Sequence, residues 1–136
     1  MQGAQPGVDM NVNIDVKPIK EPEITNGTIA GEYEVVLTIR SAARAVKDNK
    51  VDPDQKPLFI VEAAYAGRYQ LAHVPEGELE PFLLIEAPRL LFPFVRQVAA
   101  DAVMQGGLPP LLMAPIDFVQ LYHQRKAQAQ SARAAS

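Results

Sequence analysis

Apolar and polar residues alternate strictly along the first part of the chain, between residues 8 and 16. The intervening residues are polar, and the apolar positions are Val8, Met10, Val12, Ile14 and Val16. Successive side chains of a strand point to opposite faces, so the pattern predicts a strand with one buried and one solvated face. Such strands are typical of antiparallel sheets. Pro18, Pro22 and the Asn26-Gly27 pair predict loops or turns after it.

Three more strands are predicted between residues 31 and 74. The second covers residues 31–42 and is followed by a long, exposed polar loop at 47–56. The third covers residues 58–65, Gly67 supplies a tight turn, and residues 68–74 return as a short fourth strand. Apart from Glu62, the third strand is apolar on both faces. We therefore expect its second face to be covered as well, by helices, by another subunit or by a ligand.

Helical patterns follow Pro75, where the sheet is expected to end. Residues 81–87 predict a short helix, and the main helix is expected to begin near Leu90, with Pro93 tolerated in its first turn. An apolar stripe then recurs at helical spacing, and Gly106 is well placed as the C′ residue. The stripe consists of Val95, Val98, Ala99, Ala102 and Val103.

A last helix is predicted from Phe118 to about Gln128. Asp117 is a candidate N-cap, with Gln120 three residues on and a hydrophobic pair, Ile116 and Leu121, at staple spacing. Residues 1–6 and 129–136 are small and polar and are expected to fray. The expected fold is thus one α+β domain over residues 1–136, an antiparallel sheet packed with two helices.

Composition narrows the classes of function. With 136 residues and 48% hydrophobic content, the chain can bury one core. A formal charge of -3 argues against a nucleic-acid-binding protein. The absence of cysteine excludes disulfides, thiolate catalysis and cysteine-ligated zinc. No apolar run reaches the roughly 18 residues of a membrane span, and no signal peptide is visible, so we expect an intracellular protein.

Candidate catalytic groups are sparse. His73 and His123 are far apart in sequence and have no metal-type partners nearby. Asp52 and Asp54 are interpreted as solvated loop charges, because the later acidic ligands of a calcium loop are missing. The glutamates at 76, 78 and 80 are interpreted as an acidic link near a helix N-terminus. Gly106-Gly107 lacks the context of a phosphate-binding loop. We therefore expect no enzyme and no cofactor.

Apolar surface, in contrast, is in excess. The third strand, the run Leu111-Leu112-Met113 and the pair Phe92 and Phe94 together exceed what one small core needs. Two explanations stay open: all of these residues form core or subunit interface, or some of them line an adaptable groove for peptide segments. Methionine and aromatic side chains suit such a groove because they repack at low cost.

Three spaced motifs stand out in the second half of the chain: Leu90-Leu91-Phe92-Pro93-Phe94-Val95-Arg96, Gly106-Gly107-Leu108-Pro109-Pro110 and Leu112-Met113-Ala114-Pro115-Ile116-Asp117-Phe118. With these motifs the chain resembles the SecB-type protein-export chaperones, and the resemblance covers nearly the whole chain, from about Gln5 to Gln124. It implies a cytoplasmic homotetramer, a dimer of dimers, whose subunits combine a four-stranded antiparallel sheet with a long helix. It also implies that hydrophobic grooves hold unfolded precursors and pass them to the SecA translocation ATPase, without ATP hydrolysis by the chaperone.

The resemblance also implies site residues. The run Phe59-Ile60-Val61-Glu62 is similar to a family motif, which implies that Ile60 and Glu62 face outward and contact SecA; the zinc of that contact belongs to SecA. Glu62 is alternatively a simple solubilising edge charge. Three alternating residues are implied in tetramer assembly: Val61, Ala63 and Tyr65. The client groove is expected to include Val8, Met10, Val12, Phe92, Leu112 and Met113.

The chain departs from the family pattern at both ends. Family members usually begin a few tens of residues earlier, with an additional strand and a long crossover loop, so we expect three strands if that front is absent. The strand at residues 8–16 would then be a sheet edge. The tail carries Arg125, Lys126 and Arg133, where acidic tails are common in the family.

The sequence thus predicts a non-enzymatic chaperone that binds unfolded export precursors by hydrophobic contact and delivers them to SecA. Two alternatives remain. One is a SecB-like chaperone dedicated to a toxin–antitoxin system, and the other is a small ligand-binding or enzymatic α+β domain.

Overall fold

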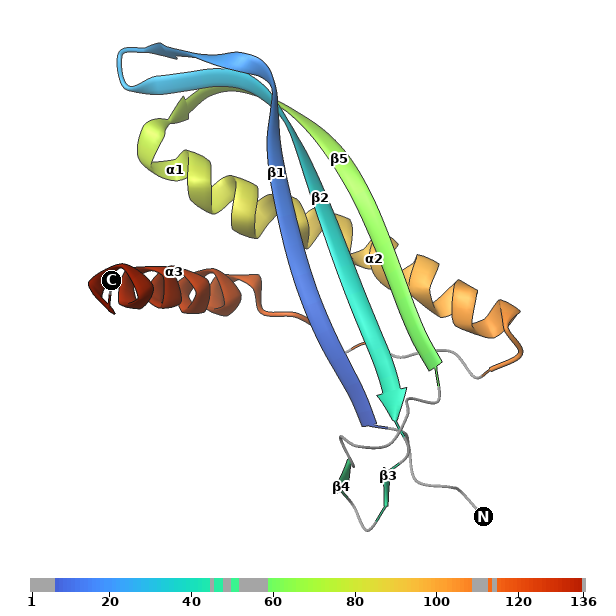
Figure 1. Ribbon diagram of the computed structural model, residues 1–136. Coiled ribbons are helices and arrows are strands. Elements are labelled where there is room, and N and C mark those ends of the chain that lie inside the picture. Colours follow the sequence, from blue (N-terminus) through green and yellow to red (C-terminus); the bar gives the residue numbers. More distant parts are fainter. Residues whose placement is uncertain are drawn as a thin grey trace.

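The computed structural model describes residues 7–44, 46–47, 50–51, 59–108, 113 and 115–135. Three long strands form an antiparallel sheet in the order β1-β2-β5: β1 (Gly7–Thr25), β2 (Thr28–Arg44) and β5 (Phe59–Pro75). A small hairpin of β3 (Val46–Lys47) and β4 (Lys50–Val51) follows β2 (Figure 1). The rest of the predicted loop at 47–56 lies outside the described residues.

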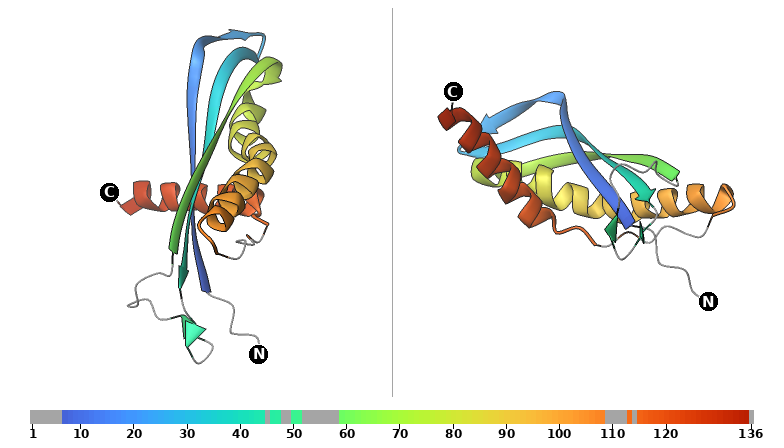
Figure 2. Two further views of the ribbon diagram at one scale, coloured as in Figure 1. Left: turned by 90° about the vertical axis from the view of Figure 1, so that its right-hand side faces the viewer. Right: turned by 60° about the horizontal axis from the view of Figure 1, so that its bottom comes forward.

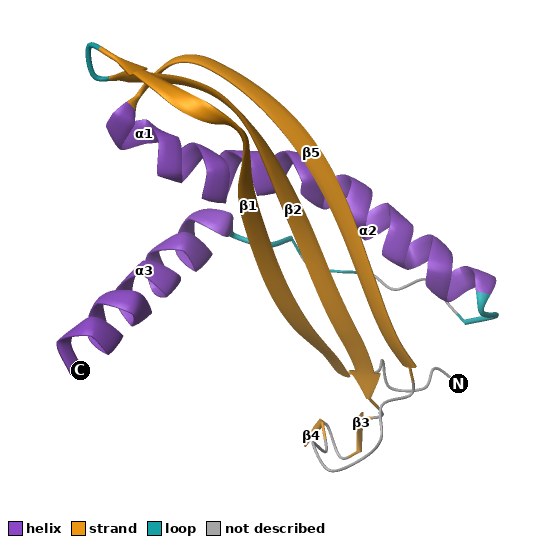
Figure 3. Cartoon of the chain, turned by 45° about the horizontal axis from the view of Figure 1, so that its top comes forward, coloured by secondary structure: helices purple, strands orange, loops and turns teal. Residues whose placement is uncertain are grey.

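Helices cover one face of this sheet, so the fold is the expected α+β arrangement of three strands and helices in two layers (Figure 2). The helices are α1 (Glu76–Pro81), the π-helical segment η1 (Phe82–Glu86), α2 (Ala87–Gln105) and α3 (Phe118–Ala135). Helix α2 packs mainly against β5 and β2. Helix α3 starts beneath the sheet and projects outward past β1 (Figure 3).

Strand β1 is longer than we predicted, because Pro18 and Pro22 do not end it. β1 lies at the edge of the sheet, where a proline that cannot donate a ladder hydrogen bond is tolerated. The register with β2 shifts between Pro18 and Lys20 and again before Glu23, which absorbs the irregular backbone. The turn comes at Asn26 and Gly27, whose positive φ angles of 52° and 77° suit a tight hairpin.

Gly67 does not make a turn, and the predicted third and fourth strands are one strand, β5. The pairing with β2 runs without interruption from Phe59 to Leu71, opposite Ala43 to Gly31. A Cβ atom at Gly67 would lie 3.0 Å from side-chain atoms of both Leu91 and Tyr69. Glycine is therefore needed here for the close approach of α2 to the sheet, and not for a reversal of the chain.

The helical layer begins at Glu76, earlier than predicted, and continues through α1, η1 and α2 to Gln105. Pro88 explains the π-helical turn, because a proline cannot donate to the carbonyl of Leu84 and its ring would clash with it. The helix widens there, and the Ala87 amide donates to the Phe82 carbonyl, five residues back. Pro93 lies within α2 and not in its first turn. It cannot donate to the Arg89 carbonyl, but both residues are exposed, so water can reach that carbonyl.

Both helix ends have recognisable caps. The prediction of Gly106 as the C′ residue is wrong by one position. The left-handed glycine after α2 is Gly107 (φ 83°). The Gly107 amide donates to the Met104 carbonyl at 2.9 Å and the Leu108 amide to that of Val103 at 3.2 Å, which is the Schellman pattern. At the start of α3, Asp117 Oδ1 accepts from the Gln120 amide at 3.1 Å, as expected of an N-cap.

The core lies between β2, β5 and the helical layer. Every second residue of β2 from Tyr33 to Ala43 is buried, and the helices contribute a matching set of buried side chains: Leu83, Ile85, Ala87, Leu91, Phe92, Val95, Ala99, Val103 and Phe118. Val98 and Ala102, which we had placed on the buried stripe, are exposed instead. This core fixes the sheet against α2 and leaves β1 at its margin.

Candidate functional site

The helix side of β1 is an incompletely covered apolar surface. Val12, Ile14 and Val16 pack against the margin of the core but stay half-buried, and Met10 is 37% exposed. The cause is geometric: α2 lies against β2 and β5, so β1 extends beyond the area that it covers (Figures 1 and 2). We call these four residues the β1 trough, and they form an apolar strip that an extended peptide could contact.

Helix α3 borders the β1 trough. Only its first turns are packed, through buried Phe118 and half-buried Leu121 and Tyr122. The Tyr122 hydroxyl hydrogen-bonds Glu80 Oε1 of α1 at 3.0 Å, and Arg125 Nη2 donates to the Val12 carbonyl of β1. These polar contacts hold α3 beside β1 with little buried apolar area.

A hollow of about 330 Å³ lies between α3 and the start of the helical layer. Its lining combines acidic, apolar and cationic side chains. Glu80 and Leu84 come from the helical layer, and α3 contributes Tyr122, Arg125, Lys126, Ala129 and Gln130. The Lys126 ammonium lies 5.6 Å from the centre of the Tyr122 ring. Arg125 and Lys126 therefore give α3 two positive charges on this side, opposite Glu80 of α1, and Arg125 also reaches β1.

Strand β5 carries five of the predicted site residues and separates them onto its two faces. Ile60, which is 49% exposed, and Glu62 lie on the open face, as the resemblance implies for SecA-contacting residues. Val61, Ala63 and Tyr65 face the helices: Ala63 is only 5% exposed, and Tyr65 stacks on Phe94 of α2 with ring centroids 5.1 Å apart. A charge at Ala63 would therefore disturb the subunit's own packing, so Tyr65 is the better probe of assembly.

The predicted groove residues do not all lie on one surface. Met10 and Val12 belong to the β1 trough, whereas Phe92 and Met113 are buried in the core, where Phe92 packs edge-to-face with Phe118. Phe92 and Met113 are therefore core residues, and in this subunit they are not accessible to a client. The side chain of Val8 and all of Leu112 lie outside the described residues.

An exposed apolar surface on α2 joins Phe94, which the sequence had indicated as excess apolar surface, to two residues that it had not. Leu90, Phe94 and Val98 recur every four residues along α2 and are 45–58% exposed. We call them the α2 stripe. Their spacing was visible in the sequence, but the same helix also carries a buried set, and the sequence alone does not say which set faces the sheet.

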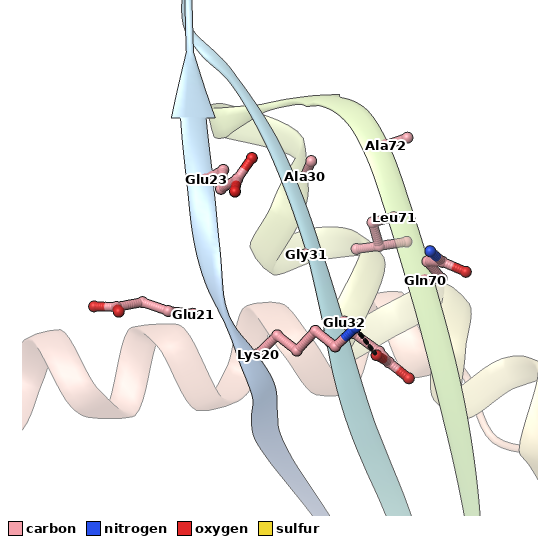
Figure 4. Close-up of a pocket in the computed structure, with 9 residues that line it drawn as sticks. All are labelled: Lys20, Glu21, Glu23, Ala30, Gly31, Glu32, Gln70, Leu71 and Ala72. Carbon is pink, nitrogen blue, oxygen red and sulfur yellow. Dashed lines mark ion pairs between the residues drawn. The ribbon is translucent and has the colours of Figure 1, made fainter.

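A hollow of about 470 Å³ lies at the bent end of the sheet (Figure 4). It is lined by Lys20, Glu21 and Glu23 of β1, Ala30, Gly31 and Glu32 of β2, and Gln70, Leu71 and Ala72 of β5. Glu32 forms ion pairs with Lys20 at 3.9 Å and with Arg68 at 3.0 Å, while Glu21 extends away from β2. These charges pair with one another at the surface and do not converge on a common point, so the hollow does not have the form of an active site.

The described residues were also considered as metal ligands and as membrane-spanning helices. Within the described part of the chain, no three histidine, cysteine or acidic side chains gather as a metal site. His73 lies near the end of β5 and His123 lies on α3, in separate elements. None of the described helices is long and apolar enough to cross a membrane.

The sequence of this chain is similar to those of known proteins over most of its length. The family model "Preprotein translocase subunit SecB" matches residues 1–129. The chain is similar to "Protein-export protein SecB" of Caulobacter sp. strain K31, with 43% identity over 128 residues that cover 94% of this chain and 68% of the relative. It is 44% identical over 128 residues to the protein of that name from Paramagnetospirillum magneticum, covering 94% of this chain and 71% of the relative.

A solved structure has a similar fold. It is a Mycobacterium tuberculosis SecB-like chaperone in complex with a ChAD peptide from an antitoxin; the TM-score is 0.55 at 14% identity, with 85% of this chain and 82% of that chain covered. The two-layer fold, the family model over residues 1–129 and the curated relatives lead to the same conclusion. The chain belongs to the SecB family.

Proposed function

We propose that this protein is a protein-export chaperone that binds unfolded precursors and holds them by hydrophobic contact. Membership of the SecB family and the relatives' name as protein-export proteins support this function. The observation that carries it is the β1 trough, an apolar strip left half-covered beside a loosely packed helix. Binding and not catalysis is the proposed activity, and the cytoplasm, where precursors are present before translocation, is the proposed location.

The physical basis of client binding is the burial of apolar side chains along β1. Each apolar CH₂ group removed from water contributes roughly 0.8 kcal/mol, so many shallow contacts add up without a specific sequence. The positive border at Arg125 and Lys126 would add attraction for acidic or carbonyl-rich segments. Unfolded chains expose apolar segments, whereas folded proteins have buried most of them.

A matched pair of substitutions tests the client surface. Met10→Glu places a charge in the trough, whereas Asn11→Glu places the same charge on the opposite, open face of β1. We expect Met10→Glu to weaken the capture of a slowly refolding protein by about tenfold, since a carboxylate must be desolvated, and Asn11→Glu to leave it unchanged. Both variants should keep the wild-type melting temperature. Equal capture by both variants would contradict a client site on this side of β1.

The choice of client protein also separates the alternatives. Capture of several unrelated unfolded proteins supports a general role in export. Binding of one partner alone would favour the dedicated toxin–antitoxin chaperone.

We further propose that the protein assembles as a homotetramer, a dimer of dimers. The α2 stripe supports assembly, because three large apolar side chains at four-residue spacing on one helix face are typical of a surface buried by another copy. Tyr65 lies next to this stripe through its contact with Phe94. Light scattering of Phe94→Glu tests this proposal, with Gln97→Glu, three residues further along the same helix, as the control. Only Phe94→Glu should lower the mass of the assembled protein.

SecA is the proposed partner for delivery, through Ile60 and Glu62. Their side chains share the open face of β5, where no described helix covers them. Ile60→Ser and Glu62→Gln should each weaken SecA binding, measured by titration calorimetry. Wild-type affinity in both variants would exclude this surface as the contact.

A further inference from the structure

Methionine sulfur is the most readily oxidised group of this chain, because the sequence contains neither cysteine nor tryptophan. The methionines are at positions 1, 10, 104 and 113. Among those in the described part of the chain, Met113 is only 3% exposed, whereas Met10 is 37% and Met104 is 49% exposed. An oxidant dissolved in water can therefore reach the sulfur of Met10 and of Met104, while the core protects Met113.

The two accessible methionines differ in their surroundings. Met10 belongs to the β1 trough and is followed on the same face of β1 by half-buried Val12. Met104 lies in the last turn of α2, which packs against β5 and β2. Oxidation converts an apolar thioether into a polar sulfoxide. At Met10, and not at Met104, this change places a polar group in the strip that we propose for clients.

A buried hydroxyl lies directly beside Met10. Ser41 is the residue opposite Met10 in the pairing of β1 with β2, and its side chain is completely buried. Its hydroxyl has no hydrogen-bond partner within the described part of the chain, and its neighbours in the same row of β2, Ile39 and Ala43, are apolar. A buried hydroxyl without a partner costs free energy, so an acceptor brought to it is stabilising. Directly opposed Cβ atoms are about 4.5–5.5 Å apart, a gap that a methionine side chain spans.

We propose that Met10 is a site of reversible oxidation, that its sulfoxide oxygen accepts a hydrogen bond from Ser41, and that this modification switches off client capture. The effect on capture rests on the proposed function, whereas the chemistry rests on the Met10–Ser41 pair alone. In the reduced protein the thioether is at most a weak acceptor, so the hydroxyl stays unsatisfied and the trough stays apolar. In the oxidised protein the hydroxyl gains a strong acceptor, and the first position of the trough becomes polar.

Hydrogen peroxide is sufficient as the oxidant. A lone pair of the Met10 sulfur attacks one peroxide oxygen, so that an S–O bond forms and the O–O bond breaks. The sulfur is oxidised by two electrons and the peroxide is reduced, because the leaving hydroxide takes the proton of the transferred oxygen and departs as water. Methionine sulfoxide reductases reverse the change, with one enzyme for each epimer of the sulfoxide. The state of Met10 can therefore be reset.

Peptide mass spectrometry after exposure to hydrogen peroxide tests the site. We expect Met10 and Met104 to gain an oxygen atom well before Met113 does. Capture is then measured before oxidation and again after removal of the peroxide, with reduced and carboxymethylated α-lactalbumin as the permanently unfolded probe. Oxidation should weaken capture by about tenfold in Met104→Leu, and sulfoxide reductases should restore it. Oxidation should not change capture in the matched variant that carries both Met104→Leu and Met10→Leu. Complete oxidation of Met10 without a loss of capture, or an equal loss in both proteins, would overturn the inference.

Ser41→Ala tests the hydrogen bond separately. The substitution removes the unpaired hydroxyl, so in the Met104→Leu background the reduced protein should melt at or above the temperature of its parent. Oxidation of Met10 should then lower the melting temperature further in the Ser41→Ala protein than in the parent, because only Ser41 offers the sulfoxide a donor. Equal shifts in the two proteins would show that the hydroxyl does not bond the sulfoxide and would overturn the pair.

Met10→Gln reproduces the oxidised state without an oxidant, since its side-chain carbonyl takes the place of the sulfoxide group. It should weaken capture about as much as oxidation does, and normal capture by this variant would overturn the switch. The outcomes also separate this inference from the proposed function. A protein that captures no unfolded probe, yet shows the Ser41-dependent shift on oxidation, would contradict the function and support the Met10–Ser41 site. Equal capture in both oxidation states would overturn the switch and leave the function standing.

Discussion

Helices α2 and α3 differ in how much of their surface is packed: α2 lies against β5 and β2, whereas α3 contacts mainly η1. α2 buries seven residues: Ala87, Pro88, Leu91, Phe92, Val95, Ala99 and Val103. In α3 the described residues from His123 to Ser131 are all exposed, and the helix is held by Phe118, by its half-buried first turns and by surface hydrogen bonds. We therefore expect α2 to contribute more to stability than α3, and α3 beyond its first turns to shift at smaller cost. Under the proposed function, the part that shifts is best placed beside the client surface, and α3 borders the β1 trough that we propose for that role.

The largest expected difference between the two helices comes from one substitution made in each. Leu91→Ala should lower the free energy of unfolding by about 3 kcal/mol, because it leaves a cavity between α2 and the sheet. Leu121→Ala removes the same atoms from a half-buried site in α3, and we expect a loss of about 1 kcal/mol or less. Urea unfolding of both variants measures the difference. Equal losses would mean that α3 is as firmly packed as α2.

Two glycines test how tightly α2 approaches the sheet, because an added Cβ atom is crowded at Gly67 and unhindered at Gly77. Gly67→Ala should destabilise by about 1–3 kcal/mol, since its Cβ would meet Leu91 and Tyr69 at 3.0 Å. Gly77→Ala, in α1, has nothing within 4 Å of the added Cβ and should be neutral or stabilising by up to about 1 kcal/mol. Thermal melting of the two variants checks the opposite signs. If Gly67→Ala melts at or above the wild-type temperature, the tight approach of α2 to β5 is wrong.

Two tyrosine hydroxyls give a smaller effect. Tyr69 donates to the Ala87 carbonyl at 3.1 Å in a half-buried site beneath α2, and Tyr69→Phe should cost about 1 kcal/mol. Tyr122 bonds Glu80 at an exposed site beside α3, so Tyr122→Phe should cost no more than about 0.5 kcal/mol. The shift of the urea midpoint of each variant, at an unchanged m value, measures the two losses of stability. A greater cost for Tyr122→Phe would reverse our ranking of the two helices.

The smallest effect is a dependence on alkaline pH. Burial raises the pKa of the Tyr69 phenol above its ordinary value of 10.0, because the charged form is less solvated in the fold. The stabilisation is fully present below pH 10 and is lost as pH rises through the folded-state pKa. Wild-type stability should therefore fall more steeply above pH 10 than that of Tyr69→Phe. Parallel profiles would show that Tyr69 ionises as freely in the fold as in the unfolded chain.

Local patterns correctly predicted β1, the turn after it and the N-cap of α3, which neighbours in sequence determine. The alternation at residues 8–16 placed β1, Asn26-Gly27 placed its turn, and Asp117 placed the start of α3. Gly67 was misread because glycine is a turn signal over short range, whereas its actual reason, Leu91, is 24 residues away in another layer. No local pattern contains that contact.

The candidate site was also only partly predictable, because the sequence does not show which apolar residues the fold buries. The resemblance assigned Ile60 and Glu62 to an outward face, and the structure exposes both. Burial of Phe92 and Met113 could not be read from their hydrophobicity, because a groove and a core use the same residue types. The helix start was also predicted too late: Pro81, Pro88 and Pro93 look like interruptions in sequence, but a π-helical turn and solvent exposure accommodate them.

The π-helical turn has a consequence for how the long helix follows the sheet. Buried and half-buried residues recur every four positions along it, at 79, 83, 87, 91, 95, 99 and 103. An α-helix has 3.6 residues per turn, so a four-residue repeat rotates about 40° around the axis at each step. The wider turn at η1 absorbs one residue and turns the row back by about 100°. Deleting a single residue there would leave the sequence of α2 intact and yet point α1 away from the sheet.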